Sequence, residues 1–557
     1  MSRIPIIVSL AALSAAFCAV SGAQDLSAAD QATANVAIKA IRPEAIAAHM
    51  RFLSDDLLEG RLTGSRGHEI AVQYVATELE AMGLKPAGAN GTWFQSVPLR
   101  KVDLVAEQSS FELLRDGKSH TLVFGQDYLM DGNPLATDSS VEAAVVFVGF
   151  GVSAPEFQYD DYAGADVRGK VVVTVRGAPP RFAATERAYF SDGVVKARIA
   201  AEHGAVGIIS LIPPEFFERY KWDWIVPQVR AGGMWWLDPQ GVPADTRPEI
   251  RAAALMNTSG AEELFKGAAK TLPEIFAASR ESKSESFELP LKVKIHRVTR
   301  YTTLESRNVI GKLAGSDPAL AKEYVVFTAH MDHLGICRPA EQDKVCHGAY
   351  DNASGTSAVL EVARAFSSLR RAPRRSVLFV FVTGEERGLR GSDYFAHYPT
   401  VPIDSIVADV NLDGAPGLIF PNKDIVPRGA EHSNLAKNVE AAARKMGYTI
   451  SPDPIPEEVI FIRSDQYSFA KQGVPAVFMN GGRQSADPKL DGAAIEEKWI
   501  SSIYHTPKDN MSQPFYFESA ARSTALSFLV GYEVAQQADR PTWNAGDFFG
   551  TKFSRKQ

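Results

Sequence analysis

The chain has 557 residues, of which 45% are hydrophobic and 22% charged, and its formal net charge is -7. This length exceeds that of one ordinary domain and predicts two or three folded units with sizeable cores. The composition is that of a soluble globular protein. The weakly acidic balance gives no reason to expect nucleic acid or an anionic membrane as a partner.

The N-terminus has the pattern of a secretory signal peptide. Arg3 supplies a positive charge, residues 4–20 are apolar with small residues interspersed, and Ser21-Gly22-Ala23 resembles a cleavage site. We therefore predict a signal peptide over residues 1–23 and export to the periplasm or out of the cell.

A membrane anchor and a lipoprotein are the alternatives to a cleaved signal peptide. A membrane anchor is disfavoured because the apolar run is short and ends in small residues. A lipoprotein attached at Cys18 is disfavoured because Phe17 stands where a small residue is needed. Since no other stretch approaches the roughly 20 apolar residues of a membrane helix, we expect a mature protein without stable membrane association.

The next two regions differ in their secondary-structure patterns. Between His68 and Met82 apolar residues recur at helical spacing, and Gly83 follows at a C-cap position. We assign residues 36–103 to the N-terminal part of a catalytic domain. Residues 104–289 contain short strand patterns, such as residues 145–148 and 171–175, and are expected to form an inserted, mostly-β domain.

Four of the seven tryptophans lie in this insertion, namely Trp222, Trp224, Trp235 and Trp236. We interpret them as buried core residues, and an aromatic rim facing the substrate is the alternative.

Residues 290–545 alternate between strand and helix patterns. Strands are expected over residues 324–329, 376–383, 406–411 and 476–479, and a helix over residues 353–369. This alternation predicts an α/β catalytic domain with a mixed, mainly parallel sheet flanked by helices. In such sheets functional sites form at the carboxyl ends of the strands.

Most of the conspicuous acidic residues and histidines fall at these predicted strand ends. They are His330, Asp332, Asp351, Glu385, Glu386, Asp413 and His505. Carboxylates and imidazoles are ligands that zinc accepts, and this set is too large for one tetrahedral ion. We therefore predict two metals that share one carboxylate. Among the other histidines, His333, His347, His397 and His432 were assigned to surface or capping positions.

Two cysteines, Cys337 and Cys346, remain after removal of the signal peptide, and both lie in one loop. In an exported protein this predicts a disulfide. Metal binding by the two thiols is the alternative, which is disfavoured because the metal site already has its ligands.

Together these motifs resemble the co-catalytic zinc exopeptidases of metallopeptidase family twenty-eight, which include bacterial leucyl aminopeptidases, glutamate carboxypeptidase II and the non-catalytic transferrin receptor. The resemblance covers nearly the whole mature chain and implies the zinc exopeptidase, phosphorylase/hydrolase-like fold. Residues 52–61 with 64–67 resemble the N-terminal signature of the family, and residues 464–470 with 473–476 resemble its late motif.

The resemblance implies a role for each residue of the site. His330, Asp351 and Asp413 would bind one Zn²⁺, and Asp351, Glu386 and His505 the other, with Asp351 as the bridge. Asp332 would orient His330, and Glu385 would be the general base for a hydroxide shared by the two metals. Tyr350 and Gln466 depart from the pattern of many relatives, and neither is a metal ligand in this scheme.

The middle of the chain also resembles the protease-associated domain that this family often carries. Residues 148–152, 159–162, 169–173 and 196–198 carry that resemblance. The domain is either an accessory fold or a cover that selects substrates by size.

The leading functional hypothesis is an aminopeptidase that removes N-terminal residues from peptides. A carboxypeptidase or dipeptidase on the same fold is the first alternative, and Arg463 is the candidate for holding a substrate carboxylate. Tyr467 either stabilises the oxyanion or packs beside Phe469. A glutaminyl cyclase-like acyltransferase is disfavoured by the complete metal set, and a catalytically dead binding protein by the presence of Glu385.

Overall fold

The computed structural model describes residues 26–283, 285–338 and 342–554. The predicted signal peptide, residues 1–23, lies outside these ranges. In the part of the chain that is described, no helix is long and apolar enough to cross a membrane.

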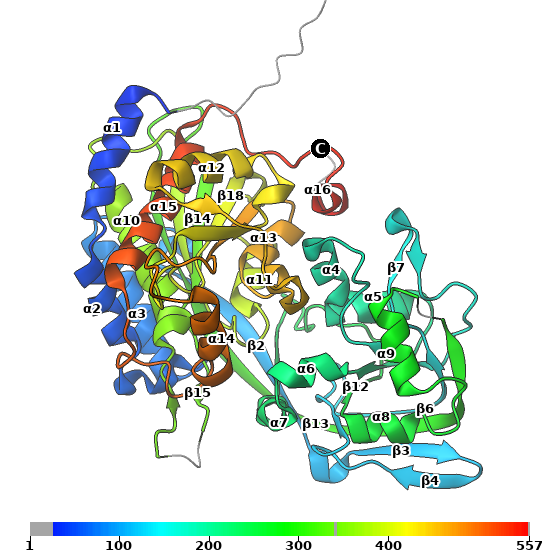
Figure 1. Cartoon of the computed structure of the whole chain (residues 1–557). Coiled ribbons are helices and arrows are strands. Elements are labelled where there is room, and N and C mark those ends of the chain that lie inside the picture. Colours follow the sequence, from blue (N-terminus) through cyan, green and yellow to red (C-terminus); the bar gives the residue numbers. More distant parts are fainter. Residues whose placement is uncertain (1–25, 284, 339–341, 555–557) are drawn as a thin grey trace, which may run out of the picture.

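A mixed sheet forms the centre of the catalytic region (Figure 1). Its parallel strands are, in spatial order, β17 (Ser376–Val382), β14 (Tyr324–His330), β18 (Ile406–Asn411) and β21 (Ala476–Gly481). On either side of these parallel strands, β13 (Phe287–Leu313) runs antiparallel to β17, and β19 (Asp424–Arg428) runs antiparallel to β21. The predicted mixed, mainly parallel sheet is confirmed.

The central strands are buried on both faces, which explains their continuous apolar sequences. In β17, Phe379 and Phe381 enter one hydrophobic core, whereas Leu378 and Val380 enter another on the opposite face. Side chains of a strand alternate between faces, so a strand covered on both sides needs apolar residues at every position. This packing holds the strand ends in fixed positions.

Helices cover both faces of this sheet. One face packs against α1 (Ala28–Ala37), α2 (Pro43–Leu53), α3 (Arg66–Ala81), α10 (Gly355–Ser367), α12 (Leu435–Met446) and α15 (Phe517–Gln536). The other packs against α11 (Arg390–His397) and α13 (Gln466–Lys471), through Phe395 and Phe469. The helix predicted over residues 68–82 is α3, and the Ser65 hydroxyl caps it by accepting a hydrogen bond from the amide of His68.

A separate hydrophobic core lies in the middle segment, defined here as residues 105–286 between β2 (Phe94–Leu104) and β13. Its strands include β3 (Ser110–Arg115), β4 (Lys118–Thr121), β5 (Tyr128–Leu129), β6 (Asp138–Phe147), β9 (Val171–Val175), β10 (Gly207–Leu211) and β12 (Ala252–Met256). Its helices are α4 (Ala184–Ser191), α5 (Gly193–Glu202), α6 (Pro214–Arg219), α7 (Trp222–Arg230), α8 (Thr258–Leu264) and α9 (Leu272–Arg280). The expectation of a mostly-β segment understated these helices.

One long strand, β13, pairs with strands of both the middle segment and the catalytic sheet. Its first half pairs with β6 and β3, and its second half pairs with β2 and β17. In addition β11 (Gly233–Trp236) returns from the middle segment to pair with β2. Short pairings elsewhere involve β1 (Lys85–Pro86), β7 (Ser153–Ala154), β8 (Tyr159–Asp160) and β20 (Thr449–Ile450). Backbone pairing therefore joins the middle segment to the catalytic sheet.

The tryptophans of the middle segment do not form one buried core, which corrects that interpretation. Trp236 is buried and its indole donates to the Asp393 carboxylate, whereas Trp224 is 39% exposed. Trp222 and Trp235 are half-buried. Residues of α7 are all at least partly exposed, so its aromatic side chains have no core to fill.

The C-terminal region packs on both the catalytic region and the middle segment. After α14 (Gly492–Ser502) and α15, the chain ends its described part with α16 (Phe548–Phe553) (Figure 1). The ring of Phe548 lies 5.3 Å from that of Tyr189 in α4, and Phe549 lies 5.1 Å from Phe461 of the catalytic region. This helix therefore packs across the boundary between them.

Candidate metal centre

The acidic residues and histidines singled out above converge at the carboxyl edge of the sheet. His330 ends β14, Glu385 and Glu386 follow β17, and Asp413 follows β18. Asp351 lies in the irregular turn Ala349–Ser354 that leads into α10, and His505 follows α14. Parallel strands end at the same edge, so the topology explains why residues far apart in sequence meet here.

The first cluster joins three residues around His330, whose side chain is fully buried. The imidazole Nε2 lies 3.3 Å from Asp351 Oδ1 and 3.4 Å from Asp413 Oδ1. Suitably placed donor atoms of these three residues lie within 4.8 Å of one another. The Ser464 hydroxyl donates to Asp413 Oδ2 over 2.8 Å and fixes that carboxylate from the other side.

The second cluster uses the other oxygen of Asp351. His505 Nε2 lies 3.0 Å from Asp351 Oδ2 and 3.3 Å from Glu386 Oε2. Asp351 therefore touches both histidines, one with each carboxylate oxygen. The structure therefore places one histidine at each carboxylate oxygen of Asp351, and the assignment of these residues to two metals stays a prediction.

His333 also belongs to this cluster, although it had been assigned to the surface or capping class. It is completely buried, and its Nδ1 lies 2.6 Å from Glu386 Oε1. With Asp351 and Glu386 it forms a second group whose donor atoms could hold a cation. The signal was available, because His333 follows His330 by three residues at the same predicted strand end.

Asp332 adjoins His330, but its carboxylate makes its hydrogen bonds to other residues. Its carboxylate accepts hydrogen bonds from the Glu385 amide over 3.1 Å and from the Thr63 hydroxyl over 2.9 Å. The His330 Nδ1 lies 3.9 Å from that carboxylate and 3.2 Å from the Asp332 carbonyl oxygen. Asp332 thus fixes the backbone of the Glu385 loop and adjoins His330 mainly through its own backbone.

Glu385 lies beside the first cluster, with Oε2 at 3.8 Å from His330 Nε2. Burial raises the pKa of Glu385 well above its usual range, and the nearby carboxylates of Asp413 and Glu386 add to this effect against the opposing charge of His330. Its neighbour Glu386 turns the other way, toward His333 and His505. The two adjacent glutamates therefore face different parts of the site, as expected for a tight loop.

The chemistry of these donors fits bound cations. Three imidazoles and four carboxylates are crowded in a largely buried volume, where unpaired like charges are costly. His333 Nδ1 and Glu386 Oε1 are buried close together, yet neither makes a hydrogen bond within the described residues. Mixed nitrogen and oxygen donors are those that zinc and similar metals accept.

Two buried residues outside the predicted set support the loops of the centre. The Arg61 guanidinium donates to the carbonyl oxygens of Met331, His347 and Gly348. The Asp509 carboxylate accepts hydrogen bonds from the amides of Tyr350 and Asp351, at 2.8 and 3.1 Å. Sequence reasoning missed both functions, because an isolated Arg or Asp in a loop has no pattern that distinguishes it from a surface residue.

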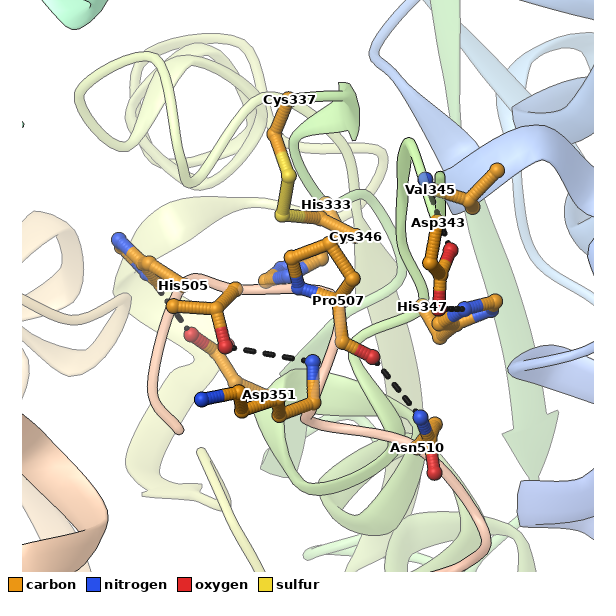
Figure 2. The surroundings of a disulfide bond; sticks show 12 residues. His333, Cys337, Asp343, Val345, Cys346, His347, Asp351, His505, Pro507 and Asn510 are labelled. Atoms are coloured by element: carbon orange, nitrogen blue, oxygen red, sulfur yellow. Dashed lines mark hydrogen bonds and ion pairs between the residues drawn. A yellow bond between two sulfur atoms is a disulfide. The ribbon is translucent and has the colours of Figure 1, made fainter. Parts of the chain in front are cut away.

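The predicted disulfide between Cys337 and Cys346 is present and joins β15 (Gly335–Ile336) to β16 (Val345–Cys346). Figure 2 shows His333, Asp351 and His505 next to this cross-linked loop. Both sulfur atoms are used in the disulfide, so they are not metal ligands. The loop connects the strand end that carries His330 and His333 to the turn that carries Asp351.

Tyr467 and Arg463 lie outside the metal clusters. The Tyr467 ring is 2% exposed, packs 6.0 Å from Phe461 and belongs to the core of the middle segment. This is the packing alternative, although the neighbour is Phe461 rather than Phe469. Arg463 makes an ion pair with Glu458 at 3.4 Å and is 45% exposed.

Comparison with known proteins agrees with this geometry. Residues 308–527 match the model of Peptidase family M28. The aminopeptidase NAALADL1 of Rattus norvegicus is 25% identical over 370 residues, which are 59% of this chain and 44% of that protein. A vacuolar membrane protease of Yarrowia lipolytica is 23% identical over 214 residues, or 38% of this chain and 18% of that protein. The chain thus spans less than half the length of these curated relatives.

Among solved structures, an aminopeptidase from Aneurinibacillus sp. strain AM-1 has the same fold. The TM-score is 0.52 at 19% identity, and the match covers 91% of this chain and 97% of the other. Fold, donor set and family match together define a zinc-metallopeptidase domain. The match to peptidase family M28 extends over residues 308–527, which include all the donor residues of the centre.

Proposed function

We propose that the chain is a di-zinc aminopeptidase that removes N-terminal residues from peptides. The observation that carries this proposal is the position of Asp351, whose two carboxylate oxygens contact His330 on one side and His505 on the other. A shared carboxylate between two sets of nitrogen and oxygen donors suits a pair of metal ions.

In this proposal His330, Asp351 and Asp413 hold one zinc ion, and Asp351, Glu386 and His505 hold the other. His333 contacts Glu386 and either orients this ligand or joins the second set. Bound zinc would supply Lewis-acid activation of water and of the scissile carbonyl.

A residue of the chain carries out the proton transfer. Glu385 accepts a proton from the attacking water and delivers it to the leaving amine. Its buried position favours this role, because burial raises its pKa and brings proton uptake closer to neutral pH. Asp332 holds the Glu385 amide and thereby positions the loop.

We further propose that residues 104–289 are a protease-associated domain inserted between catalytic parts at residues 36–103 and 290–545. Export through a signal peptide at residues 1–23, to the periplasm or the medium, belongs to the same proposal. Peptides are the proposed substrates.

The test is the release of amino acids from peptides that are unblocked, N-acetylated or C-amidated. The zinc-loaded protein is compared with the Glu385→Gln variant and with chelator-treated protein. We expect unblocked and amidated peptides to lose N-terminal residues, N-acetylated peptides to resist, and both controls to be inactive. Cleavage of acetylated but not amidated peptides would instead identify a carboxypeptidase, and no cleavage of any peptide would refute the peptidase proposal.

A further inference from the structure

A cavity lies at the N-terminus of α3, apart from the metal donors. Its volume is about 390 Å³, which is within the range of small-molecule sites in proteins. It is lined by residues of the turn that leads into α3 and by residues 305–307 of β13. None of the residues that line it is a donor of the metal centre, so the cavity is a separate candidate site.

The imidazole of His68 is the clearest sign of a ligand there. His68 lines the cavity and is 1% exposed, and neither of its ring nitrogens has a hydrogen-bond partner in the described part of the chain. Burial lowers the pKa of His68 to about 3, the charge of Arg61 lowers it further, and the backbone of Arg307 opposes the shift. The ring is therefore neutral at pH 7, with one donor and one acceptor. Because buried polar groups nearly always have partners, these two nitrogens suit a polar ligand.

The start of α3 supplies positive charge to the cavity. Ser65 caps this helix of 16 residues, and Arg66 is its first residue. Arg66 is exposed, and its guanidinium has no hydrogen bond or ion pair with any described residue. The amides at a helix N-terminus carry partial positive charge and bind carboxylates, as guanidinium groups also do. This end of the cavity therefore favours a carboxylate.

An acid without a partner lines the same cavity. Glu305 is exposed, and its carboxylate makes no hydrogen bond or ion pair with any residue of the described ranges, Arg66 included. Glu69, in contrast, is already neutralised, because its Oε1 lies 3.2 Å from Arg307 Nη1. The two charges left without partners thus have opposite signs. A simple anion or a simple cation would match only one of them.

We propose that this cavity binds a free α-amino acid, with its carboxylate at Arg66 and the N-terminus of α3 and its ammonium group at Glu305. An α-amino acid carries both charges at neutral pH, and the His68 ring provides a further hydrogen-bonding group. Free amino acids are the products of the proposed peptidase. The inference therefore rests on the proposed function for the origin of the ligand, whereas the chemistry of the cavity is independent of it.

Calorimetric titration of the zinc-loaded full chain measures this binding. L-Leucine is compared with leucinamide, which lacks the carboxylate, and with 4-methylpentanoate, which lacks the ammonium group. Acetohydroxamate, a chelating ligand that carries neither charge, is present throughout and occupies the metal ions. Binding of leucine at the metal centre is thereby kept separate from binding in the cavity.

We expect one leucine to bind per chain, and each single-charge analogue to bind about 10- to 100-fold more weakly, the usual effect of losing a charge-assisted hydrogen bond. Arg66→Gln and Glu305→Gln should each weaken leucine binding by the same factor. Arg51→Gln and Glu80→Gln are the matched controls, because Arg51 and Glu80 are also exposed but do not line the cavity. Both controls should keep the wild-type affinity.

Three results would overturn the inference: no binding of leucine, equal affinity for leucine and either analogue, or unchanged affinity in both Arg66→Gln and Glu305→Gln. The last result would place the bound leucine elsewhere on the protein. All three leave the peptidase proposal intact, because cleavage is measured separately. If leucine binds with the expected charge dependence but no peptide is cleaved, the amino-acid site stands and the peptidase proposal fails.

Discussion

At the scale of single residues, the account depends most on Asp351. Both of its carboxylate oxygens face imidazoles, and its backbone amide is held by Asp509. Its loss should therefore affect both clusters together.

We predict that Asp351→Asn lowers the zinc content below two ions per chain and reduces peptidase activity by roughly 10²–10³-fold. The amide keeps the shape of the carboxylate but removes the negative charge that two cations would share. Metal analysis after dialysis measures the first effect independently of activity. Asp343→Asn, an exposed acid in the disulfide loop, is the control and should keep both ions. Full zinc content in Asp351→Asn would contradict the bridging role.

His333 gives a second prediction at this scale. Since it contacts Glu386 from a fully buried position, His333→Gln should weaken zinc binding at the second site by about 10- to 100-fold, the usual cost of losing a group that orients a ligand. Zinc titration followed by competition with a chelator measures the affinity. The same substitution at His347, which contacts the acids Asp56 and Asp343, should leave the affinity unchanged. Equal effects of both substitutions would show that His333 has only a packing role.

The sequence predicted the residues of the centre better than their contacts. Strand ends located His330, Glu386 and Asp413, and the family resemblance implied ligand roles for these three and for Asp351 and His505. All five residues lie close together in the structure. His333 was missed although it follows His330 by three residues at the same strand end, because a single additional histidine is more often a surface or capping residue than part of a site. Asp332 was expected at His330, but its carboxylate accepts hydrogen bonds from Glu385 and Thr63, since loop geometry after a strand is not encoded by spacing.

At the scale of elements, the strands were the most predictable feature. The central strands are buried on both faces, so their sequences are continuously apolar and their ends are marked by polar residues. The first turn of α10 was less predictable. The helix was expected from residue 353, but the backbone from Ala349 to Ser354 is irregular and places Asp351 in the site before the regular helix begins.

His432 connects the start of the C-terminal helix α16 to the middle segment through an ion pair and a hydrogen bond. His432 Nδ1 lies 2.7 Å from Asp547 Oδ2, and its Nε2 lies 3.0 Å from the Thr185 hydroxyl of α4. Burial lowers the pKa of His432, but the hydrogen bond with Asp547 and the charges of Glu431 and Glu186 raise it above the usual value. Burial raises the pKa of Asp547, whereas the interactions with His432 lower it overall.

These opposite shifts predict a pH-dependent stability. The contribution of His432 is complete below its usual pKa of about 6.5 and is lost as the pH rises through its raised pKa. The contribution of Asp547 is present above its usual pKa of about 3.9 and is lost as the pH falls through its lowered pKa. We expect Asp547→Asn to reduce the free energy of unfolding by about 1–3 kcal/mol at pH 6 and by much less at pH 9.

Urea unfolding at the two pH values measures this difference. Asp539→Asn is the control, because Asp539 is exposed and lies in the same C-terminal stretch. A penalty of the same size at pH 6 and pH 9 would show that the pair does not depend on a charged His432.

At the scale of the whole molecule, the catalytic region and the middle segment share one long strand, β13. The alternation of strand and helix patterns from residue 290 predicted the catalytic sheet. The change to short strand patterns after residue 104 located the middle segment. The sequence did not reveal that β13 runs through both sheets, that β11 returns to pair with β2, or that α16 packs on α4. These are contacts between distant parts of the chain, and no local pattern specifies them.

The most direct test of the account counts the zinc ions needed for peptidase activity. Metal-free protein is titrated with zinc while the release of leucine from Leu-Leu-Leu-amide is followed. Because Asp351 joins two donor sets, we predict that activity is complete only when two equivalents have bound. Full activity at one equivalent, or without zinc, would contradict a centre built from two metals around one shared carboxylate.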